Sequence, residues 1–588
     1  MLRVLLGAAE ASDADVERAA REHAARPAAI EPVYVAWDGR LQSDVDGRVA
    51  LENGGDVGAA EVLPPGYHRL VVSSGEDALV VSAPKRCFER PGDRQWGVFL
   101  PLYALRSERN WGAGDLSDLG ALIEWTRGLG GNVVGTLPIL AAFLEEPFDP
   151  SPYSPVSRLF WNELYVDVER APELARSSEA RELIGSAKFR EQVERAREGR
   201  HVDHALVYSL KHRVLTLLAA AWDGGPPPGE LLGEYAVFRA GSHADGARYH
   251  VYVQQLMERQ LTETAGNAGL FLDMPLGVHP EGFDTWRFPE SFATGVTGGA
   301  PPDTFFTQGQ DWGFPPLHPE QIRADEYRYP IACLRHLMSH ANAIRIDHVM
   351  WMRRMFWVPE GMPAKDGVYV RYPEEELYAI LSLESHRHRC TVVGEDLGTV
   401  PRGLRSRMNR HSLHRIYVLQ YELRSPPHRV VGEVPERSQA SLNTHDMPTF
   451  AAMWEGLDTD LRLELGLIDE AGAGKDREDR ERLRTALVAF LRAEGWLDDG
   501  GVPTGHGVML ACQRYLAGSP ARTMLVNLED LWDEREPQNM PGTGSERPNW
   551  VRRTARAFEA FRDDPEVLGT LQEINQLRRG SRGGTSDD

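Results

Sequence analysis

The stretches NAIRIDH, at residues 342–348, and TVVGEDLG, at residues 391–398, decide the fold of this chain. Each is a short run of aliphatic, largely β-branched residues that reaches a carboxylate and then gives way to polar or glycine residues, which is typical of a buried parallel strand. The chain between them has helical patterning, so strand and helix alternate. Alternation of this kind predicts a parallel sheet with helical crossovers.

Further runs of the same type recur along the chain. They are NVVGTLPIL (132–140), GLFLDMPLG (269–277), ASLNTHD (440–446) and TMLVNLEDL (523–531). We therefore predict an α/β fold, a (β/α)8 TIM barrel, over residues 91–578. Two charged helical stretches, at about 168–262 and 455–505, are predicted to be helical insertions in the barrel loops.

The ends of the chain differ from the barrel pattern. Residues 1–90 contain the short β-type runs PVYVAW (32–37), YHRLVV (67–72) and ALVVSA (78–83), separated by glycine, aspartate and proline turns. We expect a small, separable N-terminal domain that is β-rich and sandwich-like. Residues 579–588 lack apolar side chains and are expected to form a disordered tail.

Composition excludes several functional classes. The 588 residues carry a formal net charge of −22, which argues against nucleic acid as a partner. No apolar run approaches the roughly 18 residues needed to cross a bilayer, so no membrane partner is expected. The four cysteines are far apart and lack CxxC spacing, which supports neither a disulfide framework nor a zinc knuckle. We expect a cytoplasmic protein, and the sequence predicts no oligomeric state.

Carboxylates end three of the predicted strands: Asp347, Glu395 and Asp446. In a βα barrel these ends meet at one rim, so the side chains are expected to converge on one cleft. Cleavage of an acetal needs a carboxylic acid to protonate the leaving oxygen and a carboxylate to attack or stabilise the sugar. Arg345 precedes Asp347 by two residues and would point to the same side of the strand. The charge of Asp396 would help Glu395 to keep its proton.

Aromatic residues in polar, Gly/Pro-rich contexts give a clue to the substrate, because sugar faces are apolar and pack on aromatic rings. They are Trp111, Tyr153, Trp312, Trp351, Phe356 and Trp357. Alternatively, each of them is a packing residue of the core.

A series of longer motifs carries a family resemblance. They are PLYALRSERNWGAGDLSDL, SPYSPVSRLFWN, GLFLDMPLGVHPEGFDTW, GAPPDTFFTQGQDWGFPP, IRIDHVM, VVGEDLGTVP, NTHDMPT and NLEDLWDEREPQNMPGT followed by PNW. In this order, from about residue 101 to 553, the sequence resembles the 4-α-glucanotransferases, or amylomaltases, of glycoside hydrolase family 77. The resemblance implies a transferase that acts on α-1,4-glucans and maltooligosaccharides.

The resemblance also assigns roles to residues. It implies that Asp347 is the nucleophile, Glu395 the acid/base and Asp446 the stabiliser of the transition state. The residues that it places in substrate binding are Arg345, which would also bond the nucleophile, His348, His445, Asp303, Trp312 and Tyr153. Asp273 and Trp111 lie in two of the motifs and are further candidates for substrate binding.

Other functions remain open. No cofactor is expected, because the GxGxxG and GxxxxGK[ST] fingerprints are absent. A hydrolase could use the same site. The pairs Asp347-His348, Glu395-Asp396 and His445-Asp446 could belong to a metal-dependent hydrolase, although these histidines lack the HxH or HExxH spacing that places two imidazoles on one ion. We expect no metal. A non-catalytic glucan-binding protein is the third alternative, disfavoured because every catalytic carboxylate is present.

Overall fold

The computed structural model describes residues 30–41, 45, 47–92, 94–145, 148–225, 227–241, 246–265, 269–302, 308–424, 428–544 and 547–580. Asp303, residues 1–29 of the expected N-terminal domain and residues 581–588 of the expected tail lie outside these ranges.

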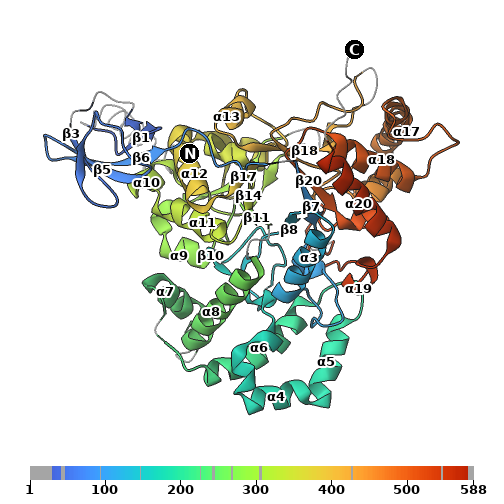
Figure 1. Cartoon of the computed structure of the whole chain (residues 1–588), viewed down its shortest axis with the longest axis horizontal. Helices are drawn as coiled ribbons and strands as arrows, with labels where there is room; N and C mark the ends of the chain where they lie inside the picture. The colour runs from blue at the N-terminus through green and yellow to red at the C-terminus, as the bar shows by residue number, and fades with distance from the viewer. Residues whose placement is uncertain are drawn as a thin grey trace.

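The centre of the molecule is a closed barrel of parallel strands, in the order β11-β14-β17-β18-β19-β20-β7-β8 (Figure 1). The predicted barrel is therefore confirmed, and each of the predicted runs contributes a strand. These strands are β8 (Val133–Gly135), β11 (Leu270–Met274), β14 (Ala343–Ile346), β17 (Thr391–Gly394), β19 (Ser438–Ser441) and β20 (Thr523–Asn527).

Two barrel strands were not predicted. They are β7 (Gln95–Phe99, QWGVF), which pairs with both β20 and β8, and β18 (His414–Val418, HRIYV), which lies between β17 and β19. Each is a short run that contains a polar or charged residue and few β-branched ones. Both are strands because neighbouring barrel strands pair with them on either side, which their local sequence does not indicate.

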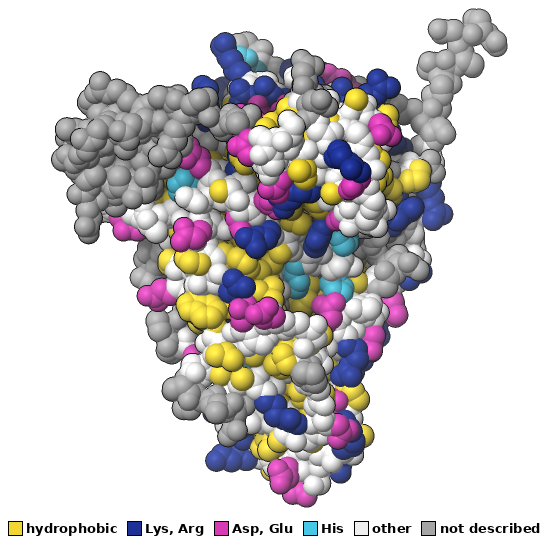
Figure 2. All heavy atoms as spheres, turned by 90° about the vertical axis from the view of Figure 1, so that its left-hand side faces the viewer, with side chains coloured by type: hydrophobic (Ala, Val, Ile, Leu, Met, Phe, Trp, Pro, Cys, Tyr) yellow, Lys and Arg dark blue, Asp and Glu magenta, His cyan; other side chains and the backbone are white. Residues whose placement is uncertain are grey.

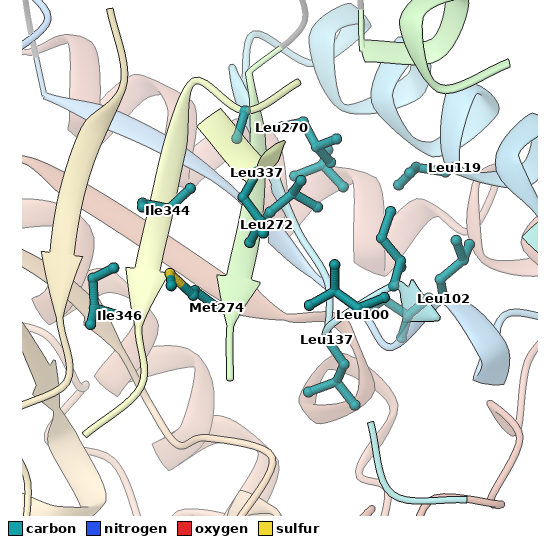
Figure 3. Close-up of a cluster of buried hydrophobic side chains, with 14 of the residues drawn as sticks. Leu100, Leu102, Leu119, Leu137, Leu270, Leu272, Met274, Leu337, Ile344 and Ile346 are labelled. Carbon is teal, nitrogen blue, oxygen red and sulfur yellow. The ribbon is translucent and has the colours of Figure 1, made fainter. Parts of the chain in front are cut away.

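Side chains alternate between the inside and the outside of the barrel, as period-two strands require. Val133, Phe271, Val393, Ile416 and Leu525 form an inner core. The outer face packs on the surrounding helices. Figure 3 shows part of this layer, in which Leu337 of a helix lies beside Leu272, and Leu270, Met274, Ile344, Ile346 and Leu119 belong to the same buried cluster.

The main helices that connect barrel strands follow the chain around the sheet. They are α3 (Leu116–Gly128), α8 (Gly246–Ala265), α11 (Arg328–Met338), α12 (Glu374–His388), α13 (Leu404–Arg410) and α18 (Gly505–Gly518), with α20 (Pro565–Arg579) after the last strand. Helix α3 has a capping box in which the Asp115 carboxylate accepts bonds from the backbone of Ser117 and Asp118.

The two regions expected to be helical insertions contain helices in the structure. The first holds α4 (Ser178–Gly185), α5 (Ala187–Arg197), α6 (His204–Ala221) and α7 (Glu230–Ala240), and its last part is the barrel helix α8. In Figure 1, α4, α5 and α6 extend below the barrel. The second holds α16 (Leu457–Glu464) and α17 (Glu470–Ala493).

A small sheet over the barrel rim was not predicted. It is antiparallel, in the order β13-β12-β15-β16, with β12 (Val296–Ala300), β13 (Gln310–Asp311), β15 (Arg354–Pro359) and β16 (Val368–Arg371). Strand β12 contains the glycine pair Gly298 and Gly299, and glycine is unfavourable for strand prediction. Added Cβ atoms at these glycines would lie 2.4 Å from Met355 Cε and 2.2 Å from Gln310 O, so close packing explains the glycines.

The N-terminal region is β-rich, as expected, but within the described residues its strands form one sheet rather than two packed sheets. The order is β2-β1-β6-β5-β3-β4, with β1 (Val33–Trp37), β2 (Arg40–Leu41), β3 (Gly47–Ala50), β4 (Asp56–Gly58), β5 (Gly66–Val72) and β6 (Asp77–Ala83). Side chains on one face, including Val49 and Leu70, make a small core. Val33, Leu79 and Val81 belong instead to the main core of the molecule.

The surface matches a chain with many charges of both signs. Figure 2 shows Lys and Arg side chains interspersed with Asp and Glu on one face, with hydrophobic side chains between them. No helix among the described residues has the length and apolar character to cross a bilayer.

Candidate active site

A cleft of about 820 Å³ opens at the C-terminal ends of the barrel strands. Asp347 follows β14, Glu395 follows β17, and Asp446 lies in the loop after β19. All three carboxylates line this cleft. The structure thus brings together the residues that the sequence placed at strand ends.

Asp347 is held by a cation and by the backbone. Arg345 Nη2 lies 2.8 Å from its Oδ1, and the Leu276 amide donates to its Oδ2 at 3.4 Å. The Arg345 guanidinium also donates from Nη1 to both carboxylate oxygens of Asp273, each at 2.8 Å. Arg345 and Asp273 are partners in the register of β14 and β11, so strand pairing itself places the guanidinium between two carboxylates.

Burial and charge act in opposite directions on this cluster. Burial raises the pKa of Asp273, while Arg345 opposes that rise. Burial alone would lower the pKa of Arg345, but Asp273 and Asp347 raise it well above its usual value. The guanidinium therefore remains charged and is a fixed cation beside Asp347.

Glu395 is set up to hold a proton near neutral pH. Burial, opposed by Arg345 and helped by Asp347, raises its pKa to about 7. Backbone amides hold the side chain in place: His348 N donates to Oε2 at 3.0 Å, and Leu397 N donates to Oε1 at 2.6 Å. The direction agrees with the sequence prediction, but the main cause is burial.

Asp396 contributes less to Glu395 than the sequence suggested. Its carboxylate is fully buried and accepts bonds from Arg405 Nε and Arg415 Nε, each at 2.8 Å, and from Ile416 N at 3.1 Å. These partners compensate its charge, so it affects the pKa of Glu395 less than burial, Arg345, Asp347 and the Leu397 amide do.

Asp446 is ionised and anchored. Burial alone would raise its pKa, but His445, a hydrogen bond from Asn539 and the charge of Arg345 lower it to about 2. His445 Nε2 lies 3.1 Å from Asp446 Oδ2, and Asn539 Nδ2 donates to Oδ1 at 2.7 Å. The side chain still exposes 41% of its surface to the open cleft, where a ligand can reach it.

Tyr153 connects the cluster of Asp347, Arg345 and Asp273 with His445 and Asp446. Its hydroxyl donates to Asp273 Oδ2 at 2.7 Å and lies 2.7 Å from His445 Nε2. The Tyr153 ring also stacks on the His445 ring, with centroids 5.3 Å apart, and Trp550 packs against both rings. Contacts therefore run without a break from Asp347 through Arg345, Asp273, Tyr153 and His445 to Asp446.

His348 and Trp312 also line the cleft. The His348 backbone is left-handed, with φ of 45°, and burial lowers its pKa to about 4, so the ring is neutral at neutral pH. The Trp312 ring meets it edge-on with centroids 5.2 Å apart. This pair gives the cleft an aromatic wall next to Asp347.

Trp111 does not reach the site. It is buried, donates from Nε1 to Glu169 Oε1 at 3.0 Å and packs against Phe189 of α5. Trp357 is also a core residue, and Trp351 packs against Tyr372, whereas Phe356 does line the cleft. The alternative of a packing role holds for these tryptophans.

The cleft residues that were not singled out from the sequence include Asn539, Trp550 and Tyr421. Asn539 and Trp550 belong to the C-terminal NMPGT and PNW motifs, which were recognised only as wholes. Tyr421 accepts a bond from Gly398 N at 3.0 Å and so supports the loop after Glu395. It follows β18, a strand that was not predicted, and so its position at the rim could not be expected.

The alternative of a metal-dependent hydrolase requires a cluster of metal-ligating side chains. Among the described residues, no group of three or more His, Cys, Asp or Glu side chains could hold a metal ion. His348 and His445 instead contact aromatic rings and site carboxylates.

Comparison with known proteins agrees with the geometry. The family model for 4-alpha-glucanotransferase, glycoside hydrolase family 77, matches residues 100–227 and 232–557. A 4-alpha-glucanotransferase of Mycobacterium tuberculosis (strain ATCC 25618 / H37Rv) is 34% identical over 557 residues, which cover 83% of this chain and 76% of that protein. One of Haemophilus influenzae is 29% identical over 596 residues, covering 88% of this chain and 84% of that protein.

Solved structures share the fold. An amylomaltase from Corynebacterium glutamicum superposes with a TM-score of 0.85 at 23% identity, covering 96% of this chain and 92% of that one. An amylomaltase from Streptococcus agalactiae in complex with acarbose gives a TM-score of 0.66 at 17% identity, covering 83% of this chain and 100% of that one. Together with the family match, these findings mean that the chain is an enzyme that belongs to the 4-alpha-glucanotransferases of glycoside hydrolase family 77.

Proposed function

We propose that this glucanotransferase moves α-1,4-glucan segments from a donor to the 4-hydroxyl of an acceptor glucan or glucose, by double displacement with retention. The observation that carries the proposal is the pairing of two unlike carboxyl groups in one cleft. Glu395 has a pKa raised to about 7, and Asp347 pairs with the fixed cation Arg345. One group is suited to give a proton and the other to attack.

In the first half of the reaction, Glu395 protonates the glycosidic oxygen while an Asp347 oxygen attacks the anomeric carbon. The bond from that carbon to the leaving oxygen breaks, and an ester to Asp347 forms. The sugar chain attached to that oxygen leaves and takes the proton with it. The Leu276 amide and Arg345 hold the attacking carboxylate in place.

In the second half, the Glu395 carboxylate takes the proton from the 4-hydroxyl of an incoming sugar. That oxygen attacks the anomeric carbon and releases Asp347. Two inversions at the same carbon restore its configuration, and Glu395 regains the proton with which it started.

Asp446 stabilises the positive charge that develops on the sugar in the transition states of the two half-reactions. Its pKa of about 2 keeps it negative, and its exposed surface faces the cleft. A fixed negative group beside an oxocarbenium-like sugar lowers the energy of the transition state. It can also accept bonds from sugar hydroxyls, with Asn539 and His445 fixing its orientation.

Transfer is favoured over hydrolysis by the walls of the cleft. Tyr153, Trp312, Phe356 and Trp550 supply aromatic surface around the carboxylates. A second sugar bound on such surface holds its hydroxyl near the intermediate at a high effective concentration, and it displaces water. The names of the relatives, 4-alpha-glucanotransferase and amylomaltase, support this choice.

The product balance from maltotriose tests the proposal. Transfer yields glucose together with maltopentaose and longer chains, while the total number of reducing ends stays constant. A rise in reducing ends without longer chains would make the protein a hydrolase. Binding of maltotriose without turnover would make it a glucan-binding protein, and the Asp347→Asn variant gives the background for both measurements.

A further inference from the structure

A second cavity, of about 190 Å³, lies at the opposite end of the barrel from the catalytic cleft. Every barrel strand contributes a residue from its beginning. The residues are Gln95 of β7, Val133 of β8, Phe271 of β11, Ala343 of β14, Thr391 and Val393 of β17, His414 of β18, Gln439 of β19 and Thr523 of β20. The cavity therefore lies at the N-terminal mouth of the barrel.

The chain itself forms the rim of this cavity. Residues 89–92 precede β7 and line the cavity together with Arg522, which lies just before β20. By a comparable measure, about 10–15 Å³ is enough to admit one water molecule. The space thus admits a small organic molecule.

Polar and apolar groups in the cavity are separated. Val133, Phe271, Ala343 and Val393 form its apolar side, toward the inside of the barrel. Gln95, Thr391, Gln439 and Thr523 add amide and hydroxyl groups at the strand beginnings. One apolar face and a ring of mixed donors and acceptors suit a molecule with several hydroxyl groups, such as a sugar.

One polar side chain of the cavity lacks a partner. His414 is only 4% exposed, and within the described part of the chain its Nδ1 is buried without a hydrogen-bond partner. Its Nε2 lies 3.5 Å from Glu89 Oε1. A buried ring nitrogen without a partner is costly, but Nδ1 and Nε2 of His414 have almost no accessible surface, so a ligand in the cavity would contact its other polar groups.

The charges at the mouth favour an anion. Glu89 is compensated by Arg437, whose Nε donates to Oε1 at 2.9 Å, and Arg522 Nη2 lies 2.8 Å from Glu436 Oε1. The Arg522 side chain is nevertheless 41% exposed, so its guanidinium remains within reach of a ligand. Arg90 is exposed, lines the cavity and has no carboxylate partner in the described ranges. Guanidinium donors of this kind bind phosphate groups.

We propose that the N-terminal mouth of the barrel is a binding site for a small phosphorylated sugar. Its hydroxyls are bound by Gln439 and Thr523, and its phosphate by Arg90 and Arg522. The site is separate from the catalytic cleft, with which it shares no lining residue. It therefore neither depends on the proposed reaction nor restates it.

Calorimetric titration of the full chain with glucose 6-phosphate tests the site, with glucose and inorganic phosphate titrated separately. The Asp347→Asn variant saturated with maltotriose is the protein sample, so that turnover is absent and the cleft is occupied. We expect one saturable site that binds glucose 6-phosphate at least tenfold more tightly than either glucose or phosphate. Equal affinity for phosphate alone, or no saturable binding, would overturn the proposal.

Variants locate the binding. Arg90→Ala should weaken it about tenfold or more, which is the loss of about 1.4 kcal/mol, whereas Arg86→Ala, an exposed arginine in the same segment that does not line the cavity, should leave it unchanged. Thr523→Val keeps the shape of the side chain and should weaken binding severalfold. Binding that maltotriose displaces, or that survives both Arg90→Ala and Thr523→Val, would place the ligand elsewhere and refute the site.

Discussion

Arg345 is the residue on which the catalytic cleft depends. It is shared by Asp347, the proposed nucleophile, and Asp273, a buried carboxylate that does not line the cleft. Because Tyr153 donates to Asp273 and also contacts His445, the position of the guanidinium is tied to the far wall of the site. Such a network holds reacting groups in place before the substrate arrives, which is how a protein lowers the cost of reaching the transition state.

The two carboxylates with proposed catalytic roles, Asp347 and Glu395, should respond differently to the leaving group. Asp347→Asn should lower kcat by roughly three orders of magnitude or more with maltotriose and with α-glucosyl fluoride, since neither donor can form the ester. Glu395→Gln should lose about 10²- to 10⁴-fold with maltotriose but retain the glycosylation step with the fluoride, measured as a burst of fluoride release, because that leaving group needs no proton. Asp499→Asn, an exposed position, is the control. Rescue of Asp347→Asn by the fluoride, and not of Glu395→Gln, would reverse the roles.

The raised pKa of Glu395 predicts the basic side of the pH profile. The protonated form is the active acid, and it predominates below the pKa of about 7 and is lost above it. With maltotriose, kcat/KM should therefore fall about tenfold per pH unit above that value. The rate of glycosylation by α-glucosyl fluoride should not fall in this range. The same basic limb with both donors would show that another group titrates there.

At the scale of single residues, the sequence predicted the acids but not their environment. Asp347, Glu395 and Asp446 could be found because strand ends in a barrel converge. Burial of Glu395 and the hydrogen bond from Asn539 to Asp446 arise from segments far apart in the chain, and local sequence does not carry them. Trp111 shows the converse, because a tryptophan in a glycine-rich segment can still belong to the core.

At the scale of elements, closure of the barrel depends on the close approach of β7 and β8. Gly97 lies in the middle of β7, and a Cβ atom there would come within 1.7 Å of the Val133 carbonyl oxygen. Backbone cannot yield by that amount without separating the strands. This glycine explains why QWGVF is a poor strand by composition and yet occupies a central position in the sheet.

Gly97→Ala should therefore prevent folding or destabilise the protein by more than about 4 kcal/mol. Gly128→Ala is the matched control, because Gly128 ends α3, is exposed and has nothing within 4 Å of an added Cβ. It should be neutral or stabilise by up to about 1 kcal/mol. Urea unfolding followed by circular dichroism measures both, and a stable Gly97→Ala would mean that β7 can shift relative to β8.

Most of the strands that were predicted from the sequence have a distinctly aliphatic composition. The runs at β8, β11, β14, β17 and β20 are largely aliphatic because helices cover them, whereas β19 has the polar sequence SQAS. The rim sheet of β12, β13, β15 and β16 is held by long-range pairing between segments that surround β14. Its glycines and polar residues give no periodic signal, so it could be found only in three dimensions.

At the scale of the whole molecule, the N-terminal sheet is attached to the barrel by a buried ionic cluster. Glu384 of α12 has no exposed side-chain surface, and its carboxylate accepts bonds from Tyr67 of β5 at 2.8 Å and from Arg335 of α11 at 3.0 and 3.1 Å. Arg387 lies 3.2 Å from the same carboxylate. Burial would raise the pKa of Glu384, but these partners and His388 lower it to about 2, so the cluster remains charged.

This docking qualifies the expectation that the N-terminal region is a separable domain, which stays a prediction. The sheet has its own small core, but Val33, Leu79 and Val81 are part of the main one. Backbone bonds also cross the junction, since Cys87 N donates to His411 O at 2.8 Å. A β domain with such contacts contributes to the stability of the barrel helices on which it lies.

The Tyr67 hydroxyl gives a test of the docking that leaves the apolar contacts intact. Tyr67→Phe removes one donor from a buried, charged acceptor and should lower the free energy of unfolding by about 1.5–3 kcal/mol, as measured in urea. Tyr34→Phe, in the same sheet, loses a contact with the exposed Glu31 amide at 3.1 Å and should change the free energy of unfolding by less than about 0.5 kcal/mol.

Helix α12 leads into β17, at whose end Glu395 lies, but the cluster is at the opposite end of that strand from the cleft. The basic limb of the pH profile should therefore be the same in both variants and in the natural protein. Equal stability of the two variants would mean that apolar packing alone holds the sheet, and a shifted limb would mean that docking reaches the acid/base.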